Sequence, residues 1–308
     1  MSNQSSQLST IVVEPKDEDL KDLQLEVHFN LWNSDKNDIH CLDIGLMCPI
    51  RESKYSIELK IPGCSSHVEN LIEDIKKDQV ACNVFNELVR VTSVVNQYVL
   101  FTKEKSNKSF LVFDGDINCE TDNKGKRTLI TLDVEKNNYQ PSITDLYFRI
   151  RIPNFDIKAI SACDNSLSRF FVPYCEKSVV YDFRLNDTKL LSVAEGKKLQ
   201  EKKIVFSKIH FLLIGDINET AQLNNGPIKI RVFENHNWDN YISKVHPIDK
   251  PMIAYHMTKK DDSSASFLLK LQANKTNAFR LTLYTIAVIL LSLVANIVYN
   301  LICFYCHG

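Results

Sequence analysis

The C-terminal part of this chain is an uninterrupted apolar run. No charged side chain occurs between Leu281 and Cys306, and His307 and Gly308 follow. A helix needs about 20 predominantly apolar residues to cross about 30 Å of hydrocarbon, and it satisfies its own backbone hydrogen bonds there. A buried helix of a soluble core is the alternative interpretation. We expect a transmembrane helix over residues 279–306.

The basic residues around this run predict its orientation. Five of them precede the run, and no Lys or Arg follows it: Lys259, Lys260, Lys270, Lys275 and Arg280. Cytosolic flanks of membrane helices carry the excess of Lys and Arg. Residues 1–13 show no secretory signal pattern. We therefore expect a single-pass, tail-anchored membrane protein with its N-terminal region in the cytosol and a lipid bilayer as its first partner.

The cysteines agree with a reducing compartment. Seven precede the apolar run, an odd number without paired close spacing: Cys41, Cys48, Cys64, Cys82, Cys119, Cys163 and Cys175. Secreted disulfide frameworks usually show even counts in short chains. Free thiols are therefore the expectation.

Composition and motifs favour no catalytic class. The formal net charge of −1 gives no basic footprint for nucleic acid, so we expect no nucleic-acid partner. Glycine is scarce, at 8 residues, and no phosphate-binding loop, nucleophile elbow or zinc-protease helix motif occurs. We expect no cofactor, and we do not favour an enzyme, although a motif-poor active site remains a third possibility.

Period-two alternation dominates the region before the apolar run. From Leu25 to Leu31 apolar residues alternate with Glu26, His28 and Asn30. The same alternation occurs at 55–61, 130–134, 146–152, 179–185 and 228–232, and the polar face of 146–152 carries Tyr147, Arg149 and Arg151. Such alternation is typical of antiparallel strands with one wet face. The predicted fold class is mainly β (α+β), with an antiparallel, sandwich-like arrangement.

Helices and boundaries complete the predicted organisation. Apolar spacing predicts a long helix from His67 to about Val91 and a shorter one around Ser192–Lys202. We expect the following division of the chain: a disordered tail over 1–22, β-rich modules over 23–160 and 161–258, and a juxtamembrane linker over 259–278. The modules are suggested by a possible repeat, since the GDIN sequence at 115–118 recurs at 215–218.

Two polar segments before the apolar run are candidates for ligand or partner contact. The first contains Asp114, Asp116, Asn118, Glu120 and Asp122. Its oxygen spacing resembles the start of a calcium loop, but Cys119 and Gly125 stand where a glycine and a bidentate glutamate are needed. The second runs from 235 to 250 and contains His236 and His246, with His256 a further ten residues on. Surface loops are the favoured interpretation of both segments, and we expect no metal site.

Polar residues within the apolar run form one stripe of the expected helix. They are Thr285, Ser292, Asn296 and Asn300. Hydrogen bonds between membrane helices contribute about 0.6–2 kcal/mol each, so the stripe predicts self-association. The alternative is that Asn300 lies near the far interface while Asn296 is bonded within its own helix.

The sequence favours a binding function. We expect a cytosolic sensor or adaptor module that recruits a protein or ligand to the membrane. The alternative is a membrane-disrupting effector of the cell-suicide or anti-viral type, whose C-terminal helices oligomerise when triggered.

Overall fold

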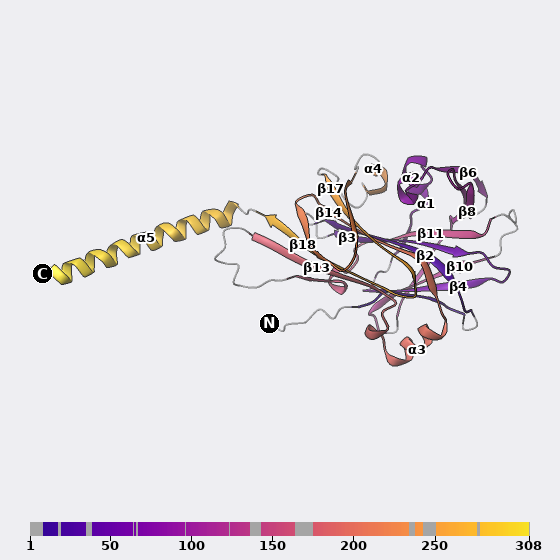
Figure 1. Cartoon of the computed structure of the whole chain (residues 1–308), viewed down its shortest axis with the longest axis horizontal. Helices are drawn as coiled ribbons and strands as arrows, with labels where there is room; N and C mark the ends of the chain where they lie inside the picture. The colour runs from indigo at the N-terminus through magenta and orange to yellow at the C-terminus, as the bar shows by residue number, and fades with distance from the viewer. Residues whose placement is uncertain are drawn as a thin grey trace.

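A computed structural model describes residues 9–17, 20–34, 39–63, 65, 67–95, 97–122, 124–135, 143–163, 175–233, 238–242, 251–275 and 278–307. It is mainly β, with one long apolar helix at the C-terminal end, which confirms the predicted fold class. Figure 1 shows this helix, α5 (Ala278–His307), projecting away from the strands.

The largest element is a ten-stranded sheet. Nine of its strands follow one another in the order β16 (Ile228–Phe233), β17 (Met252–Asp262), β14 (Val205–Asp216), β2 (Gln24–Ser34), β3 (Ile39–Pro49), β11 (Asp145–Ile152), β8 (Lys108–Phe113), β7 (Tyr98–Lys103) and β6 (Val89–Val95), and β5 (Glu69–Asn70) pairs with β11. Most pairs are antiparallel, whereas β14–β2 and β11–β8 are parallel. The order therefore interleaves distant parts of the sequence.

One face of this sheet is covered by two four-stranded sheets. The first has the order β1 (Val12–Pro15), β4 (Tyr55–Pro62), β10 (Arg127–Val134) and β9 (Asn118–Thr121), and the second has the order β12 (Ser161–Cys163), β13 (Cys175–Leu185), β18 (Ala265–Lys275) and β15 (Glu219–Asn224). Phe183 of β13 packs against Phe29 and Phe211, with ring centroids 4.8 and 4.4 Å apart. Burial of these apolar faces builds the main core.

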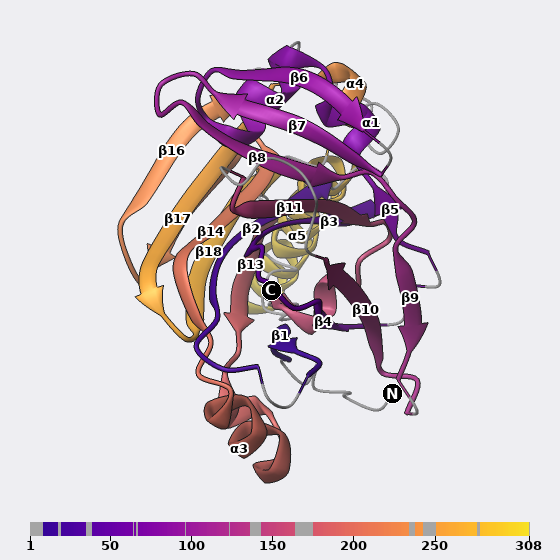
Figure 2. The ribbon, with the colours of Figure 1, turned by 90° about the vertical axis from the view of Figure 1, so that its right-hand side faces the viewer.

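The opposite face of the ten-stranded sheet has a second, smaller core. Short helices α1 (Ile72–Ile75), α2 (Asp78–Phe85) and α4 (Asp239–Ile242) contribute Ile72, Val80 and Tyr241 to it. In Figure 2 these helices lie on the same side as β6 and β7, near the edge of the sheet. The candidate site lies on this second face, the one that carries α1, α2 and α4.

The prediction of one long helix from His67 to about Val91 is wrong. The segment forms α1 and α2 and then strand β6. Asn86 adopts a left-handed conformation, with φ 54°, and ends α2. Val89–Val95 is rich in β-branched residues, which favour a strand. The shorter helix is confirmed as α3 (Val193–Glu201), which begins with a capping box formed by Ser192 and Glu195.

The linker expected over 259–278 is also wrong for most of its length. Strand β17 continues to Asp262, and β18 begins at Ala265. Phe267, Leu269 and Leu271 of β18 alternate into the main core. A period-two apolar pattern thus begins again in β18, just beyond the charged residues at the end of β17.

The expected division into a tail and two modules does not match the pairing of strands. Within 1–22, Val12–Pro15 forms buried strand β1, held by a pair of hydrogen bonds between the Asn186 side chain and the backbone of Val13. Residues 1–8 and 18–19 lie outside the described residues. Strand β14 pairs with β2, so the ten-stranded sheet contains both proposed modules. The repeat segments end two different strands of this one sheet, β8 and β14.

Helix α5 has the properties required to cross a membrane. Leu281–Cys303 is long and apolar enough by length and composition, and it is not buried against the rest of the chain. Its apolar side chains are therefore available to lipid.

A candidate ligand-binding cleft

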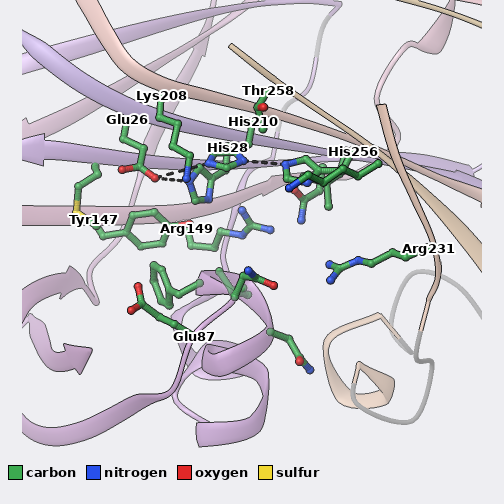
Figure 3. A pocket seen from close by; sticks show the side chains of 18 of the residues that line it. Glu26, His28, Glu87, Tyr147, Arg149, Lys208, His210, Arg231, His256 and Thr258 are labelled. Atoms are coloured by element: carbon green, nitrogen blue, oxygen red, sulfur yellow. Dashed lines mark hydrogen bonds and ion pairs between the residues drawn. The ribbon is translucent and has the colours of Figure 1, made fainter. Parts of the chain in front are cut away.

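A cleft of about 600 Å³ opens on the face of the ten-stranded sheet that carries the short helices α1, α2 and α4. Its floor is formed by alternate residues of β2, β14, β17 and β11, and its sides by α2, β16 and Trp238. Figure 3 shows the side chains of the floor pointing into this space. A cavity of this size is typical of a site for a small molecule or for a group on a larger partner.

Four polar side chains on the floor form a connected group, which we call the histidine cluster: Glu26, His28, His210 and His256. Strand pairing creates it, because His28 and His210 lie opposite each other in the parallel β2–β14 register. His28 Nε2 lies 2.9 Å from Glu26 Oε1, and His210 Nε2 lies 3.9 Å from the same oxygen.

The fourth member of the cluster holds His210 from its other side. His210 Nδ1 lies 2.8 Å from His256 Nε2, within hydrogen-bond distance. The His28 and His210 rings meet edge to face, with centroids 4.5 Å apart. The side chains of His28 and His210 are 15% and 12% exposed, so the cluster faces the cleft without being open to bulk water.

Burial keeps the imidazoles neutral. It lowers the pKa of His210 to about 2 and that of His256 to about 4, and neighbouring positive charges act in the same direction. Burial also lowers the pKa of His28. For Glu26 burial acts to raise the pKa, but the contact with His28 and the charge of Lys208 outweigh it and lower the pKa to about 2. At neutral pH the cluster is one carboxylate with three neutral imidazoles.

Positive charges outnumber negative ones around the cleft. The lining contains six permanent cations and two carboxylates: Lys103, Arg149, Lys208, Lys229, Arg231 and Lys260, with Glu26 and Glu87. Lys103 is paired with Glu87 at 2.7 Å. Among the described residues, no carboxylate lies within ion-pair distance of the other four lysine and arginine side chains of β14, β16 and β17. The cleft therefore presents a positive potential suited to an anionic group.

A second polar group, the Asp43 network, underlies one end of the cleft. It consists of Asp43, Arg149, Arg151, Trp32 and Tyr241. Arg151 donates from Nε and Nη2 to the two Asp43 oxygens at 2.6 and 2.9 Å, and Trp32 Nε1 and the Tyr241 hydroxyl donate at 2.7 and 2.8 Å. All five side chains are at most 2% exposed.

The Asp43 network carries one more positive charge than negative. Burial acts to raise the pKa of Asp43, but Arg151 and Arg149 outweigh it and lower the pKa, so the carboxylate is ionised. Two guanidinium groups share this carboxylate, since Arg149 Nη2 lies 3.9 Å from Asp43 and its Nε donates to the Tyr241 hydroxyl. Arg149 also lines the cleft and adds to its positive potential.

Gly45 makes room between the two groups. It lies across from Arg149 in the β3–β11 pairing and beside His28 in the β2–β3 pairing. A Cβ atom here would collide with the Tyr147 ring and hydroxyl and lie 3.0 Å from Arg149 Nη1. The Tyr147 hydroxyl is buried and makes no hydrogen bond within the described part of the chain. Glycine is thus required by the close approach of these side chains.

The candidate residues at 114–122 do not converge. Asp114 is paired with Lys76 at 2.8 Å, and Asp122 Oδ1 accepts from the backbone of Lys126 at 2.7 Å in the turn before β10. Asn118 and Glu120 lie on β9 and Asp116 is exposed. Where the structure describes the chain, Glu26, His28 and His210 are the one group of three potential metal ligands with ligand atoms within 4.8 Å of one another.

Sequence reasoning located only one member of the histidine cluster. His236 and His246 lie outside the described residues, and His256 joins His28 and His210 instead of them. Alternation predicts His28 on the wet face of a strand, and the sequence assigns His210 to no site. The available signal was histidine on the polar face of an alternating strand, but only the β2–β14 register brings the residues together.

The polar stripe of α5 divides into two kinds of residue. Thr285 Oγ1 donates to the Leu281 carbonyl and Ser292 Oγ to the Val288 carbonyl, both at 2.9 Å within the helix. Asn296 and Asn300 make no side-chain hydrogen bond to any described residue. Among the four residues of the stripe, the two asparagines therefore retain both donors and acceptors that another helix could satisfy.

Comparisons with known proteins assign no family. No family model matches the chain, and no curated protein matches it. Among solved structures, it is similar to the yeast delta-COP-I mu-homology domain complexed with a Dsl1 WxWxV peptide, with 10% sequence identity over 88% of this chain and 78% of that chain. The TM-score of 0.17 is too low for this likeness to support a conclusion about fold or function.

Proposed function

We propose that this protein is a membrane-anchored binding module that recruits a ligand or partner by capturing an anionic group in the cleft. Helix α5 is the anchor, and the β-rich region lies on the cytosolic side. The observation that carries the proposal is the excess of lysine and arginine side chains over carboxylates among the described residues that line the cleft. In a partly enclosed cleft such charges attract and orient an anion more strongly than they would on an open surface.

Two observations support the cytosolic orientation. The basic residues Lys259, Lys260 and Lys270 lie on the N-terminal side of α5. Among the described residues, Cys41, Cys48, Cys82 and Cys303 are free thiols. Burial raises the pKa of Cys41 to about 11, so this thiol is unreactive and acts as a core residue.

The test measures anion binding by the full chain in nanodiscs of zwitterionic lipid. Inorganic pyrophosphate and citrate serve as phosphate and carboxylate probes in isothermal titration calorimetry. We expect saturable binding of at least one probe, weakened about tenfold or more in the variant K208Q/R231Q, because each lost contact to an ionised group removes about 1.5–3 kcal/mol. The matched control is K189Q/K197Q, which removes two exposed lysines of the α3 region.

The outcomes separate cleft binding from general charge attraction. Equal weakening in the two double variants would mean that net charge alone draws the anion. Absence of saturable binding of both probes would contradict the proposal.

The effector remains a second candidate, favoured by the amides of Asn296 and Asn300, which bond to no described side chain or backbone group. On this hypothesis several α5 helices associate through these residues and disturb the membrane. N296L/N300L in the full chain should then abolish growth arrest on over-expression and the ladder of crosslinked oligomers, while membrane fractionation stays unchanged. S292A is the control, since Ser292 is already bonded within its helix. A harmless wild-type protein would remove support from the effector and leave the binding module standing.

A further inference from the structure

We propose that Glu26, His28 and His210 are the protein ligands of a site for a divalent first-row transition-metal ion on the floor of the cleft. Two imidazoles and one carboxylate with open coordination positions are a recurrent ligand set for such ions, whereas calcium and magnesium prefer oxygen ligands. The proposal is independent of the anion-binding function, so either can fail alone.

The distances fit a common centre. Metal–ligand bonds of about 2.0–2.2 Å place neighbouring ligand atoms about 3.0–3.5 Å apart in octahedral or tetrahedral geometry. The observed separations from Glu26 Oε1 are 2.9 Å to His28 Nε2 and 3.9 Å to His210 Nε2. One potential ligand atom from each of the three residues lies within 4.8 Å of the other two. The separation between Glu26 Oε1 and His210 Nε2 must close by about 0.4–0.9 Å to reach this spacing, and rotation of the partly exposed Glu26 side chain can supply that movement.

His256 supplies the support that a ligating imidazole needs. Metal-bound histidines almost always donate their other ring N–H to a neighbour, which fixes tautomer and orientation. The contact between His210 Nδ1 and His256 Nε2 at 2.8 Å provides this partner. With the proton on Nδ1 of His210, its Nε2 lone pair faces Glu26. His256 is thus a positioning residue and does not itself ligate.

The surrounding cations favour an anionic group at the coordination positions that the protein leaves open. Lys208 and Arg149 disfavour a bare cation at this place, since both line the same cleft. A metal ion bound by three protein atoms still has positions open toward the cleft, where an anionic group contacts the ion and the cations together. The site therefore holds its ion most tightly when such a group is present.

The experiment uses untagged full chain in nanodiscs, freed of metal with a chelator. Co²⁺ is titrated first, because its visible absorption reports coordination by nitrogen and oxygen ligands directly, and Zn²⁺ is then used to displace it. We expect one Co²⁺ per chain in the cluster. H28Q and H210Q should each weaken binding at least 100-fold, and H67Q, an exposed histidine of another surface, should leave binding unchanged.

His256 is tested by a pair of variants. H256F removes the acceptor for His210 Nδ1 and should weaken Co²⁺ binding about 10–100-fold. H256Q retains an oxygen acceptor and should restore most of the affinity, which a purely packing role for His256 would not produce. Thermal unfolding of each variant shows whether the fold is intact.

A measurement on the unaltered chain protects the test against misfolded variants. Zn²⁺ should shield His28 and His210 from modification by diethyl pyrocarbonate, mapped by mass spectrometry, while His67 stays reactive. Absence of both the Co²⁺ spectrum and this protection at micromolar metal would overturn the proposal. Co²⁺ binding that survives H28Q and H210Q would overturn it as well, since the ion would then be held elsewhere.

Discussion

The Asp43 network and the histidine cluster lie on the same face of the ten-stranded sheet, yet they differ in what closes them. Both carboxylate oxygens of Asp43 accept hydrogen bonds, and the Tyr241 hydroxyl of α4 is one of the donors. No described residue covers the histidine cluster in this way, and the cluster lines the cleft. A polar group sealed on all sides stabilises and specifies the fold, whereas one left open is available for binding.

The largest expected effect separates the two groups by their contribution to stability. D43N leaves Arg149 and Arg151 buried without a countercharge, so we expect the free energy of unfolding to fall by about 3–5 kcal/mol. E26Q removes a partly exposed carboxylate, 34% accessible, and should cost less than about 1 kcal/mol. Urea denaturation of both variants in detergent measures the difference, and similar losses would refute the contrast.

A smaller effect is expected at the boundary between the groups. G45A places a methyl group against the Tyr147 hydroxyl and Arg149. Overpacking of this kind costs about 1–3 kcal/mol, and relief by movement of Tyr147 would narrow the cleft. Denaturation and anion titration of the same variant check both consequences. Unchanged stability together with unchanged binding would show that Gly45 is not needed as a spacer.

The smallest effect is a dependence on pH. The pKa of Asp43 is lower in the folded chain than in the unfolded chain, so its ionised form stabilises the fold at neutral pH. That contribution is complete above the unfolded pKa of about 3.9 and is lost as pH falls through the lower folded value. Unfolding free energy measured from pH 6 to 3 should fall more steeply for the wild type than for D43N in the acid range. Parallel curves would show that Asp43 does not titrate on unfolding.

The alternating pattern correctly predicts strand β2, but it wrongly predicts that the polar residues of this strand face water. Val27 and Phe29 alternate into the main core as expected. Asn30 and His28 were expected to face water, but Asn30 is 6% exposed and His28 lines the cleft. Alternation separates apolar from polar faces, and it cannot show whether water or a distant part of the chain covers the polar one.

The sequence gives little indication of the elements that surround the Asp43 network and the histidine cluster. Helix α4 has four residues within an Asn- and Asp-rich segment, so its Tyr241 could not be connected with Asp43 by spacing. The histidine cluster depends on the pairing of β2 with β14 and of β14 with β17, which is set by the tertiary fold. The regular spacing of His256 from His236 and His246 is unrelated to its contact with His210 in the folded chain.

The parallel pairing of β2 with β14 has a consequence for how the chain folds. Strand β2 ends at Ser34, and its neighbour β14 begins only at Val205. During synthesis one edge of β2 has no partner until β14 has been made, after more than half of the chain. Non-local pairings of this kind form slowly. A fragment ending near residue 160 would leave β2 as a long exposed edge carrying Val27 and Phe29, a surface prone to aggregation. The cleft therefore exists only in a chain that has folded as one unit.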